Sequence, residues 1–312
     1  MVNQFILKVF TIGLLSLLLT TSIFTSIKPD SEDYYYVSLE KTRLLQDTPS
    51  PRIIIFGGSN IAFGIDSGMI EDEFGMPVIN DGLHALLGII PLNEIREYIY
   101  PGDIIIISIE SHIFTEAGLY GWSSALSQWI EISPDRIRYL HNPLSQMPTI
   151  YTMMLQRKIN RQTNFYLYNG SLAEMRGVYL STGFNEYGDF VGHLDDKATF
   201  EIPASKYPID ASPAAYEELE AFNQYALSKG ARVFYEAPAQ RQTNCDATGM
   251  EAIKKFYVTL MENTTIPLLT NMKQLCFPDD YFYNTNYHLN AMGRKIRTER
   301  LIENLAKALG IQ

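Results

Sequence analysis

A serine and a histidine near opposite ends of this chain have the chemistry of a nucleophile and its base. Ser59 follows the apolar run Ile53–Phe56 and two glycines. His288 stands just before a segment whose apolar residues recur at helical spacing. A serine hydroxyl attacks a carbonyl group efficiently only when a base takes its proton, and histidine is the common base. The two residues predict acyl-transfer chemistry if the fold brings them together.

The elements around these residues predict a parallel sheet that would do so. Apolar runs without polar alternation, at 52–57, 104–109 and 231–235, are typical of strands covered on both faces. Helix-like segments separate them, and shorter strands are expected at 77–80 and 266–269. The sequence therefore predicts an α/β fold with a central parallel sheet of about five strands. Sites in such sheets form beyond the carboxyl ends of the strands, where Ser59 would lie.

Four segments of the sequence resemble the conserved blocks of a known superfamily. They are Phe56–Ser67 with Ser59, Pro77–His84, Gly102–Ile107 and Tyr281–Asn290 with His288. Together they resemble the SGNH (GDSL-like) hydrolases. The nearest likeness is to the membrane-anchored, cell-surface branch, which includes proteins similar to polysaccharide O-acetyltransferases and to the D-alanyl-transfer protein of teichoic acids. The resemblance covers roughly residues 50–115 and 230–305.

The resemblance implies a flavodoxin-like three-layer sandwich and a catalytic pair of Ser59 and His288. It further implies an esterase or O-acyltransferase that forms an acyl-serine intermediate and acts on a glycan or acylated surface polymer. An acyl-donor membrane protein is an implied partner. No cofactor and no metal are expected.

The residue that should orient the histidine departs from the family pattern. The family's acid precedes the histidine by three residues, or by four in the surface branch, and these positions are Thr285 and Asn284. Asn284 can accept the histidine N–H through its carbonyl oxygen, but it brings no negative charge to stabilise an imidazolium. Asp280 is the alternative acid.

The donors that stabilise an oxyanion are also only partly recognisable. The resemblance implies the backbone N–H of Ser59 and that of Gly82 as donors. Where the family's third block would supply an asparagine, this chain has Ile109–His112. Asn60 and Asn80 are the candidate replacements, and Glu110 is a candidate for binding substrate or for the acid role. Loss of one such donor costs about 3 kcal/mol of transition-state stabilisation.

The N-terminal segment predicts a membrane anchor. Val9–Ile27 is uncharged and apolar, and its 19 residues would span about 28 Å as a helix, close to the thickness of a bilayer core. A cleaved signal peptide is the alternative reading of residues 1–28. We expect residues 29–50 to form a polar tether. The bulk of the chain is then extracytoplasmic, at the cell surface or in the periplasm.

Residues 51–312 are predicted to form one α/β domain with an insertion at about 115–210. The insertion is rich in aromatic residues and poor in strand patterns. Such residues either stack on sugar rings or pack a lid against the domain. Cys245 and Cys276 form a disulfide or remain two free thiols, because the sequence alone does not give their separation.

The charge of the chain excludes one class of partner. Its 312 residues carry a formal net charge of −10. Such a chain offers no overall basic surface to a phosphate backbone, so nucleic acid is not an expected partner.

Two functions from different classes fit these observations. One is the anchored esterase or O-acyltransferase. The other is a non-catalytic protein of the same fold that binds glycan or a partner in polysaccharide assembly or export, which the missing acid and the missing asparagine block would favour.

Overall fold

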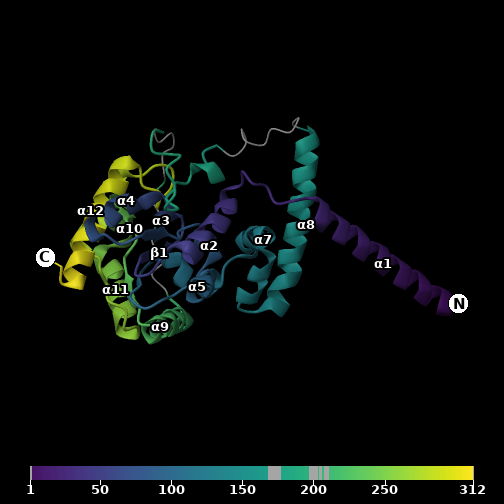
Figure 1. Ribbon diagram of the computed structural model, residues 1–312, viewed down its shortest axis with the longest axis horizontal. Coiled ribbons are helices and arrows are strands. Elements are labelled where there is room, and N and C mark those ends of the chain that lie inside the picture. Colours follow the sequence, from purple (N-terminus) through teal and green to yellow (C-terminus); the bar gives the residue numbers. More distant parts are fainter. Residues whose placement is uncertain (1, 168–176, 197–202, 204–205, 207–210, 312) are drawn as a thin grey trace.

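A parallel sheet of four strands forms the centre of the molecule (Figure 1). The computed structural model describes residues 2–167, 177–196, 203, 206 and 211–311. The strand order is β2-β1-β3-β4, with β1 at Ile53–Gly57, β2 at Val78–Asn80, β3 at Ile104–Ser108 and β4 at Arg232–Tyr235. All three pairings are parallel. The predicted α/β class and parallel sheet are confirmed.

Both faces of the sheet are buried, as the unbroken apolar runs predicted. Successive side chains of a strand point to opposite faces, so Ile54 and Phe56 enter one core cluster while Ile53 and Ile55 enter another. The first cluster includes residues of α5 (Leu92–Arg96), α9 (Pro213–Ser228) and α11 (Met250–Asn263). The second includes residues of α3 (Ser59–Gly64), α4 (Ser67–Phe74) and α12 (Ala291–Leu309). Helices therefore cover the sheet on both sides.

The sheet has four strands rather than about five. The segment expected as a last strand, 266–269, makes one isolated parallel bridge between Leu268 and Tyr235. Pro267 lies inside this segment and has no N–H to continue a ladder of hydrogen bonds. Between β2 and β3, where the sequence predicts a helix-like segment, the chain forms a 3-10 turn at Ala85–Leu87 and the short α5.

Residues expected to form a tether instead pack into the domain. The structure has a 3-10 helix at Tyr34–Val37 and α2 at Ser38–Asp47. Leu45 is buried, and buried Lys41 donates through Nζ to the carbonyl oxygens of Asn80 (2.6 Å) and Gly188 (2.7 Å). Polar composition suggested solvent exposure, but Lys41 finds acceptors that become close only in the folded chain.

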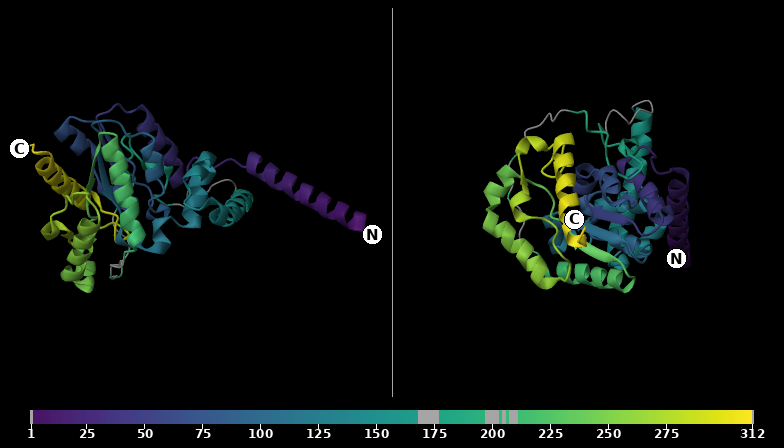
Figure 2. Two further views of the ribbon diagram at one scale, coloured as in Figure 1. Left: turned by 90° about the horizontal axis from the view of Figure 1, so that it is seen from below. Right: turned by 60° about the vertical axis from the view of Figure 1, so that its left-hand side comes forward.

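The N-terminal helix α1 (Val2–Ser26) projects away from the rest of the molecule (Figure 2). Side chains 4–15 of this helix are exposed. Within the described part of the chain, no helix has both the length and the apolar character needed to cross a membrane. The expected membrane-spanning helix therefore has no support from the structure.

The middle of the chain is mostly helical where the structure describes it. Helix α7 (Ser123–Ile132) packs against the long α8 (Pro143–Leu167). A turn follows near 184–190, closed by an antiparallel bridge between Phe184 and Phe190. The predicted insertion also includes 168–176, 197–202, 204–205 and 207–210, which lie outside the described residues. The other helices of this region are short: a 3-10 turn at Ser111–Phe114, α6 at Glu116–Leu119, and 3-10 turns at Pro134–Tyr139 and Ser181–Gly183.

A disulfide between Cys245 and Cys276 fastens a second, two-stranded sheet. The bridge joins α10 (Gln242–Thr248) to β6 (Cys276–Phe277), which pairs with β5 (Gln240–Arg241). The Cα atoms are 6.4 Å apart. Two 3-10 turns flank β6, at Met272–Gln274 and Asp279–Tyr281. Of the two states that the sequence left open, the structure has the bridged one.

Truncation should separate α1 from the segment that follows it. We expect a chain lacking residues 1–28 to fold, because the α1 side chains at 4–15 are exposed. A chain lacking residues 1–48 should not fold, because it loses buried Tyr34, Lys41 and Leu45. Circular dichroism and thermal unfolding check both. If the chain that lacks residues 1–48 unfolded cooperatively near the melting temperature of the chain that lacks residues 1–28, the packing of residues 34–47 against the domain would be contradicted.

Candidate active site

Ser59 lies at the carboxyl edge of the sheet, at the point where the strand order reverses. Strand β1 has β2 on one side and β3 on the other, and crevices that bind ligands form at such positions. Gly58 follows β1, and Ser59 is the first residue of α3. A Cβ atom on Gly58 would lie 2.6 Å from both carboxylate oxygens of Glu110 and 2.9 Å from the Cα of Ala85. Only glycine fits before Ser59.

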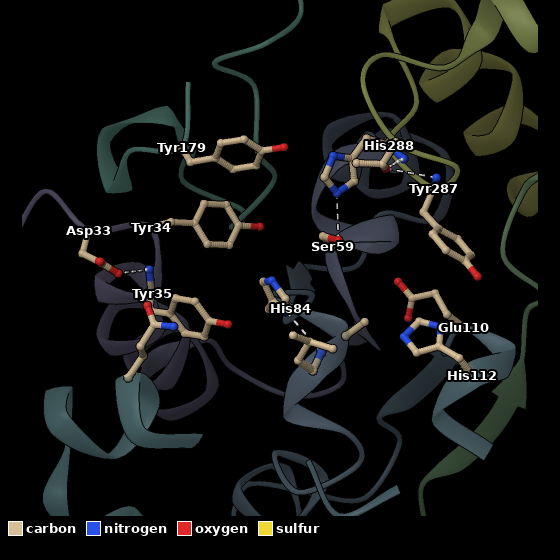
Figure 3. Close-up of a pocket in the computed structure, with 14 residues that line it drawn as sticks. Asp33, Tyr34, Tyr35, Ser59, His84, Glu110, His112, Tyr179, Tyr287 and His288 are labelled. Atoms are coloured by element: carbon tan, nitrogen blue, oxygen red, sulfur yellow. Dashed lines mark hydrogen bonds between the residues drawn. The ribbon is translucent and has the colours of Figure 1, made fainter. Parts of the chain in front are cut away.

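A chain of hydrogen bonds runs from Ser59 through His288 to Asn284. Figure 3 shows the bond between Ser59 and His288. The Ser59 hydroxyl donates to His288 Nε2, and the His288 Nδ1–H donates to Asn284 Oδ1, each over 2.8 Å. The predicted proximity of Ser59 and His288 is confirmed, as is Asn284 as the residue that holds the ring. Their catalytic role stays a prediction.

Tyr179 determines which atom donates in each of these hydrogen bonds. Asn284 Nδ2 donates to the Tyr179 hydroxyl over 2.8 Å, which leaves Oδ1 of the same amide facing His288. Because Oδ1 can only accept, the proton of neutral His288 lies on Nδ1. Nε2 is then unprotonated and able to take the proton of Ser59. This is the tautomer that a general base requires.

His288 is held neutral by burial. Its ring stacks on Phe63, with centroids 3.9 Å apart and an interplanar angle of 7°. Desolvation, and to a lesser extent the nearby His193 and His84, lower the pKa of His288 to about 3. Because the partner of its Nδ1–H is the neutral amide of Asn284, the imidazolium that forms during attack is poorly stabilised. The site therefore has the geometry of a Ser-His-Asp triad, but its histidine is a weaker base than one paired with a carboxylate.

The Ser59 hydroxyl opens into a cavity of about 560 Å³. Aromatic and imidazole rings make up much of its wall, and no Lys or Arg is among the described residues that line it. A volume of this size suits a small molecule or a sugar unit. The lining residues other than Ser59 and His288 are Asp33, Tyr34, Tyr35, His84, Ala85, Leu86, Glu110, His112, Gln128, Tyr179, Thr285 and Tyr287.

Three of the expected oxyanion donors are engaged elsewhere. The Gly82 N–H donates to Asn80 Oδ1 (2.9 Å), and Asn80 Nδ2 donates to Asp189 Oδ1 (2.8 Å). Asn60 Nδ2 donates to the carbonyl oxygen of Ser108 (3.1 Å). Both asparagines are fully buried and hold the chain together beneath the site. The assignment of Gly82, Asn60 and Asn80 to the oxyanion is therefore wrong, because each donor has a nearer internal acceptor.

Glu110 lies where a substrate-binding residue would be needed. It follows β3, is 1 % exposed and lines the cavity beside Gly58. Neither carboxylate oxygen has a hydrogen-bond partner within the described part of the chain. A buried carboxylate without partners is costly, so Glu110 is suited to accept hydrogen bonds from a bound ligand.

The acidic pair upstream of His288 lies away from the base. Asp279 pairs with Arg241 over 2.7 Å and accepts from Thr243. Asp280 is exposed, and its backbone carbonyl accepts from Asn290. Asn284 already occupies the orienting position, so the structure removes Asp280 as the alternative acid.

Sequence reasoning missed the residues that hold the site in place. Arg297 of α12 donates to the backbone oxygen of Asn60 (2.7 Å) and pairs with Glu236 (2.6 Å). Arg294, one turn earlier, pairs with buried Asp189 (2.8 Å). The signal was present: two arginines three apart stand on the helix face that also carries Leu301, which faces the core. A charge on a core-facing stripe indicates a buried partner.

Comparison with known protein families and with curated proteins found no match to this chain. Among the residues that the structure describes, no group of three or more His, Cys, Asp or Glu side chains is arranged to hold a metal ion. The site is therefore interpreted from its own geometry.

Restoring an acid at position 284 should raise activity. In Asn284→Asp a carboxylate replaces the amide beside His288 and stabilises the imidazolium, so turnover of a small acyl ester should rise about tenfold or more, each factor of ten being worth about 1.4 kcal/mol. Asp280→Asn, an exposed change outside the site, is the control and should leave the rate unchanged. A flat or reduced rate in Asn284→Asp would contradict the orienting role of Asn284.

The pKa of His288 sets the expected pH dependence of kcat/KM. A base with a pKa of about 3 stays unprotonated at mildly acidic pH. The rate should therefore hold steady from about pH 8 down to about pH 5.5, where a base with an ordinary pKa of about 6.5 would lose roughly tenfold. Asn284→Asp raises the pKa of His288, so its rate should begin to fall at a higher pH than that of the wild type.

Folding must be followed in the same experiment. Burial lowers the pKa of His84 and His193 to about 4 and that of His288 to about 3. The unfolded chain protonates these residues below about pH 6.5, so stability is lost as the pH falls below that value. Circular dichroism at each pH separates unfolding from titration of the base. A fall in kcat/KM centred near pH 6.5 in folded protein would contradict the lowered pKa.

Proposed function

We propose that this protein is an extracytoplasmic esterase or O-acyltransferase that forms an acyl-Ser59 intermediate. The observation that carries the proposal is the chain of hydrogen bonds Ser59–His288–Asn284–Tyr179 at the edge of a cavity of about 560 Å³. Nucleophile, base and orienting group stand in the order and tautomer that acyl transfer requires. Family membership in the SGNH (GDSL-like) hydrolases, and the flavodoxin-like description of the fold, are parts of this proposal.

The residues of the site define the steps. Ser59 Oγ attacks the carbonyl carbon of an ester while its proton passes to His288 Nε2. The tetrahedral intermediate collapses, the alcohol leaves with the proton from His288, and the acyl group remains on Ser59. Water or a sugar hydroxyl then attacks the acyl carbon and gives its proton to His288; the bond from that carbon to Ser59 Oγ breaks, and Ser59 takes the proton back from His288. The product is a free acid with water, or a new ester with a sugar.

The cavity supports a glycan as the substrate or acceptor. Tyr34, Tyr35, Tyr179 and Tyr287 line it, and aromatic rings present flat apolar faces of the kind that sugar rings stack on. Glu110 adds a buried acceptor for sugar hydroxyls. The absence of Lys and Arg from the described lining residues disfavours a phosphate group at this place.

Location outside the cytoplasm is part of the proposal. A structural disulfide such as Cys245–Cys276 persists in oxidising compartments and is rare in the cytosol. Attachment to a membrane through residues 9–27, and an acyl-donor protein in that membrane, remain predictions from the sequence. Fractionation of cells that express the full chain and the chain lacking residues 1–28 tests the attachment.

A second candidate function is glycan or partner binding without catalysis. The lowered pKa of His288 and the neutral orienting residue Asn284 favour it, since both weaken a general base. The same cavity would then serve as the binding site. The experiment that follows decides between the two functions.

A fluorophosphonate probe should label the wild-type protein covalently at Ser59. Ser59→Ala should not be labelled, because it lacks the attacking oxygen. Ser124→Ala removes an exposed hydroxyl and should be labelled like the wild type. Labelling is read from protein gels and from the mass of the modified peptide. Wild-type protein that stays unlabelled while folded would favour the binding function.

A further inference from the structure

Neither of the two asparagines expected to donate to the oxyanion is free to do so, because Asn60 and Asn80 are engaged elsewhere. We propose that His84 fills this role, its Nε2–H donating to the negative oxygen that develops when Ser59 attacks. This inference rests on the proposed acyl chemistry and names a catalytic residue for it.

The backbone places His84 beside the nucleophile. The Leu83 N–H donates to the carbonyl oxygen of Gly57 over 3.2 Å, so the segment after β2 runs along the end of β1. A Cβ on Gly58 would come within 2.9 Å of the Cα of Ala85. The residue before Ser59 and the residue after His84 are thus in contact. His84 and Ser59 line the same cavity, where Figure 3 shows them together.

The hydrogen bond that His84 accepts at Nδ1 places its ring proton on Nε2. The Leu86 N–H donates to His84 Nδ1 over 3.1 Å, so Nδ1 carries a lone pair and the ring proton is on Nε2. Within the described part of the chain, Nε2 forms no hydrogen bond of its own. The ring therefore has a donor with no acceptor, at the edge of a cavity where an anion is expected to form.

The ring is also held neutral and fixed in orientation. It stacks on Tyr35, with centroids 5.4 Å apart and an interplanar angle of 23°. Burial, and then the nearby His112, lower the pKa of His84 to about 4. A neutral imidazole can act as a hydrogen-bond donor to a developing oxyanion, and a donor fixed in advance stabilises it most effectively.

Two other residues that line the cavity, Glu110 and His112, fit the role less well. Glu110 as a carboxylate offers acceptors and no donor. His112 lines the cavity, but no hydrogen bond from the described residues fixes which of its ring nitrogens carries the proton; its ring lies 6.0 Å from that of Tyr287. Among the cavity histidines other than the base, His84 has its tautomer set by the backbone.

Two substitutions separate a catalytic role of His84 from a structural one. In H84N the amide oxygen takes the place of Nδ1 and can still accept from Leu86, but the side chain is too short to reach the oxyanion. In H84Q the amide nitrogen takes the place of Nε2 and can still donate to the oxyanion, but the acceptor for Leu86 is lost. A structural role favours H84N, and a catalytic role favours H84Q.

We expect H84N to lower kcat for a small acyl ester about 10²-fold or more, with KM changed only a few-fold. H84Q should recover at least about tenfold of that loss, although its melting temperature should be the lower of the two. H141N, an exposed histidine outside the cavity, is the matched control and should keep the wild-type rate.

The outcomes are distinguishable from failure of the proposed function. Wild-type protein that neither hydrolyses the ester nor reacts with the fluorophosphonate would overturn both proposals. Active wild type, with H84N retaining kcat within about threefold or H84Q folded and slower than H84N, would overturn the role of His84 alone. Slow H84N with rescue by H84Q supports it.

Discussion

The buried guanidinium of Arg297 is the interaction on which the arrangement of the site depends. From α12 it donates to Asn60 in α3, to Ser108 at the end of β3 and to Glu236 after β4. It therefore ties the ends of three strands to the last helix. The ion pair of Arg297 and Glu236 is almost fully desolvated. Removal of one partner from such a pair costs about 3–5 kcal/mol, because the other charge is left buried. Ser59 is fixed by the same network, since its helix is one of the groups held.

A second arginine extends this constraint to the middle of the chain. Arg294 donates to Asp189, which also accepts from Ser67 and from Asn80. The segment around 179–190 is thus anchored beneath the site and is not an independent lid. Because the same segment supplies Tyr179, it also holds the amide of Asn284 in the orientation that His288 requires. Asn284, which orients His288, and the residues that hold Ser59 in place are thus fixed by neighbouring hydrogen bonds to α12 and to the 179–190 segment.

The sequence predicted what depends on local pattern. The apolar runs around Ile54 and Ile105 became central strands because burial on both faces requires such runs. The expectation that Ser59 and His288 meet followed from their places after the first strand and before the last helix. Asn284 was a candidate orienter because the family resemblance places the acid four residues before the histidine. These predictions depend on local sequence and on the order of the elements, and they do not require knowledge of which distant side chains meet.

The sequence could not predict which polar groups find each other across the fold. Asn60 and Asn80 looked like free donors, and each is satisfied by an acceptor that becomes close only after folding. The Gly82 N–H is instead satisfied locally, by the side chain of Asn80 two residues earlier. Lys41 looked solvated and is buried among backbone carbonyls. For the same reason, the Nε2–H of His84, for which the described residues supply no acceptor, could be recognised only when the hydrogen bond to Nδ1 was known.

The central claim is that Ser59 carries the acyl group during turnover. The most direct test is mass spectrometry of wild-type protein quenched in acid shortly after mixing with an activated acetate ester. The account predicts a mass increase of one acetyl group on the peptide that contains Ser59, absent from the Ser59→Ala protein. Ester turnover without acetyl on that peptide, or with acetyl on another residue, would contradict it.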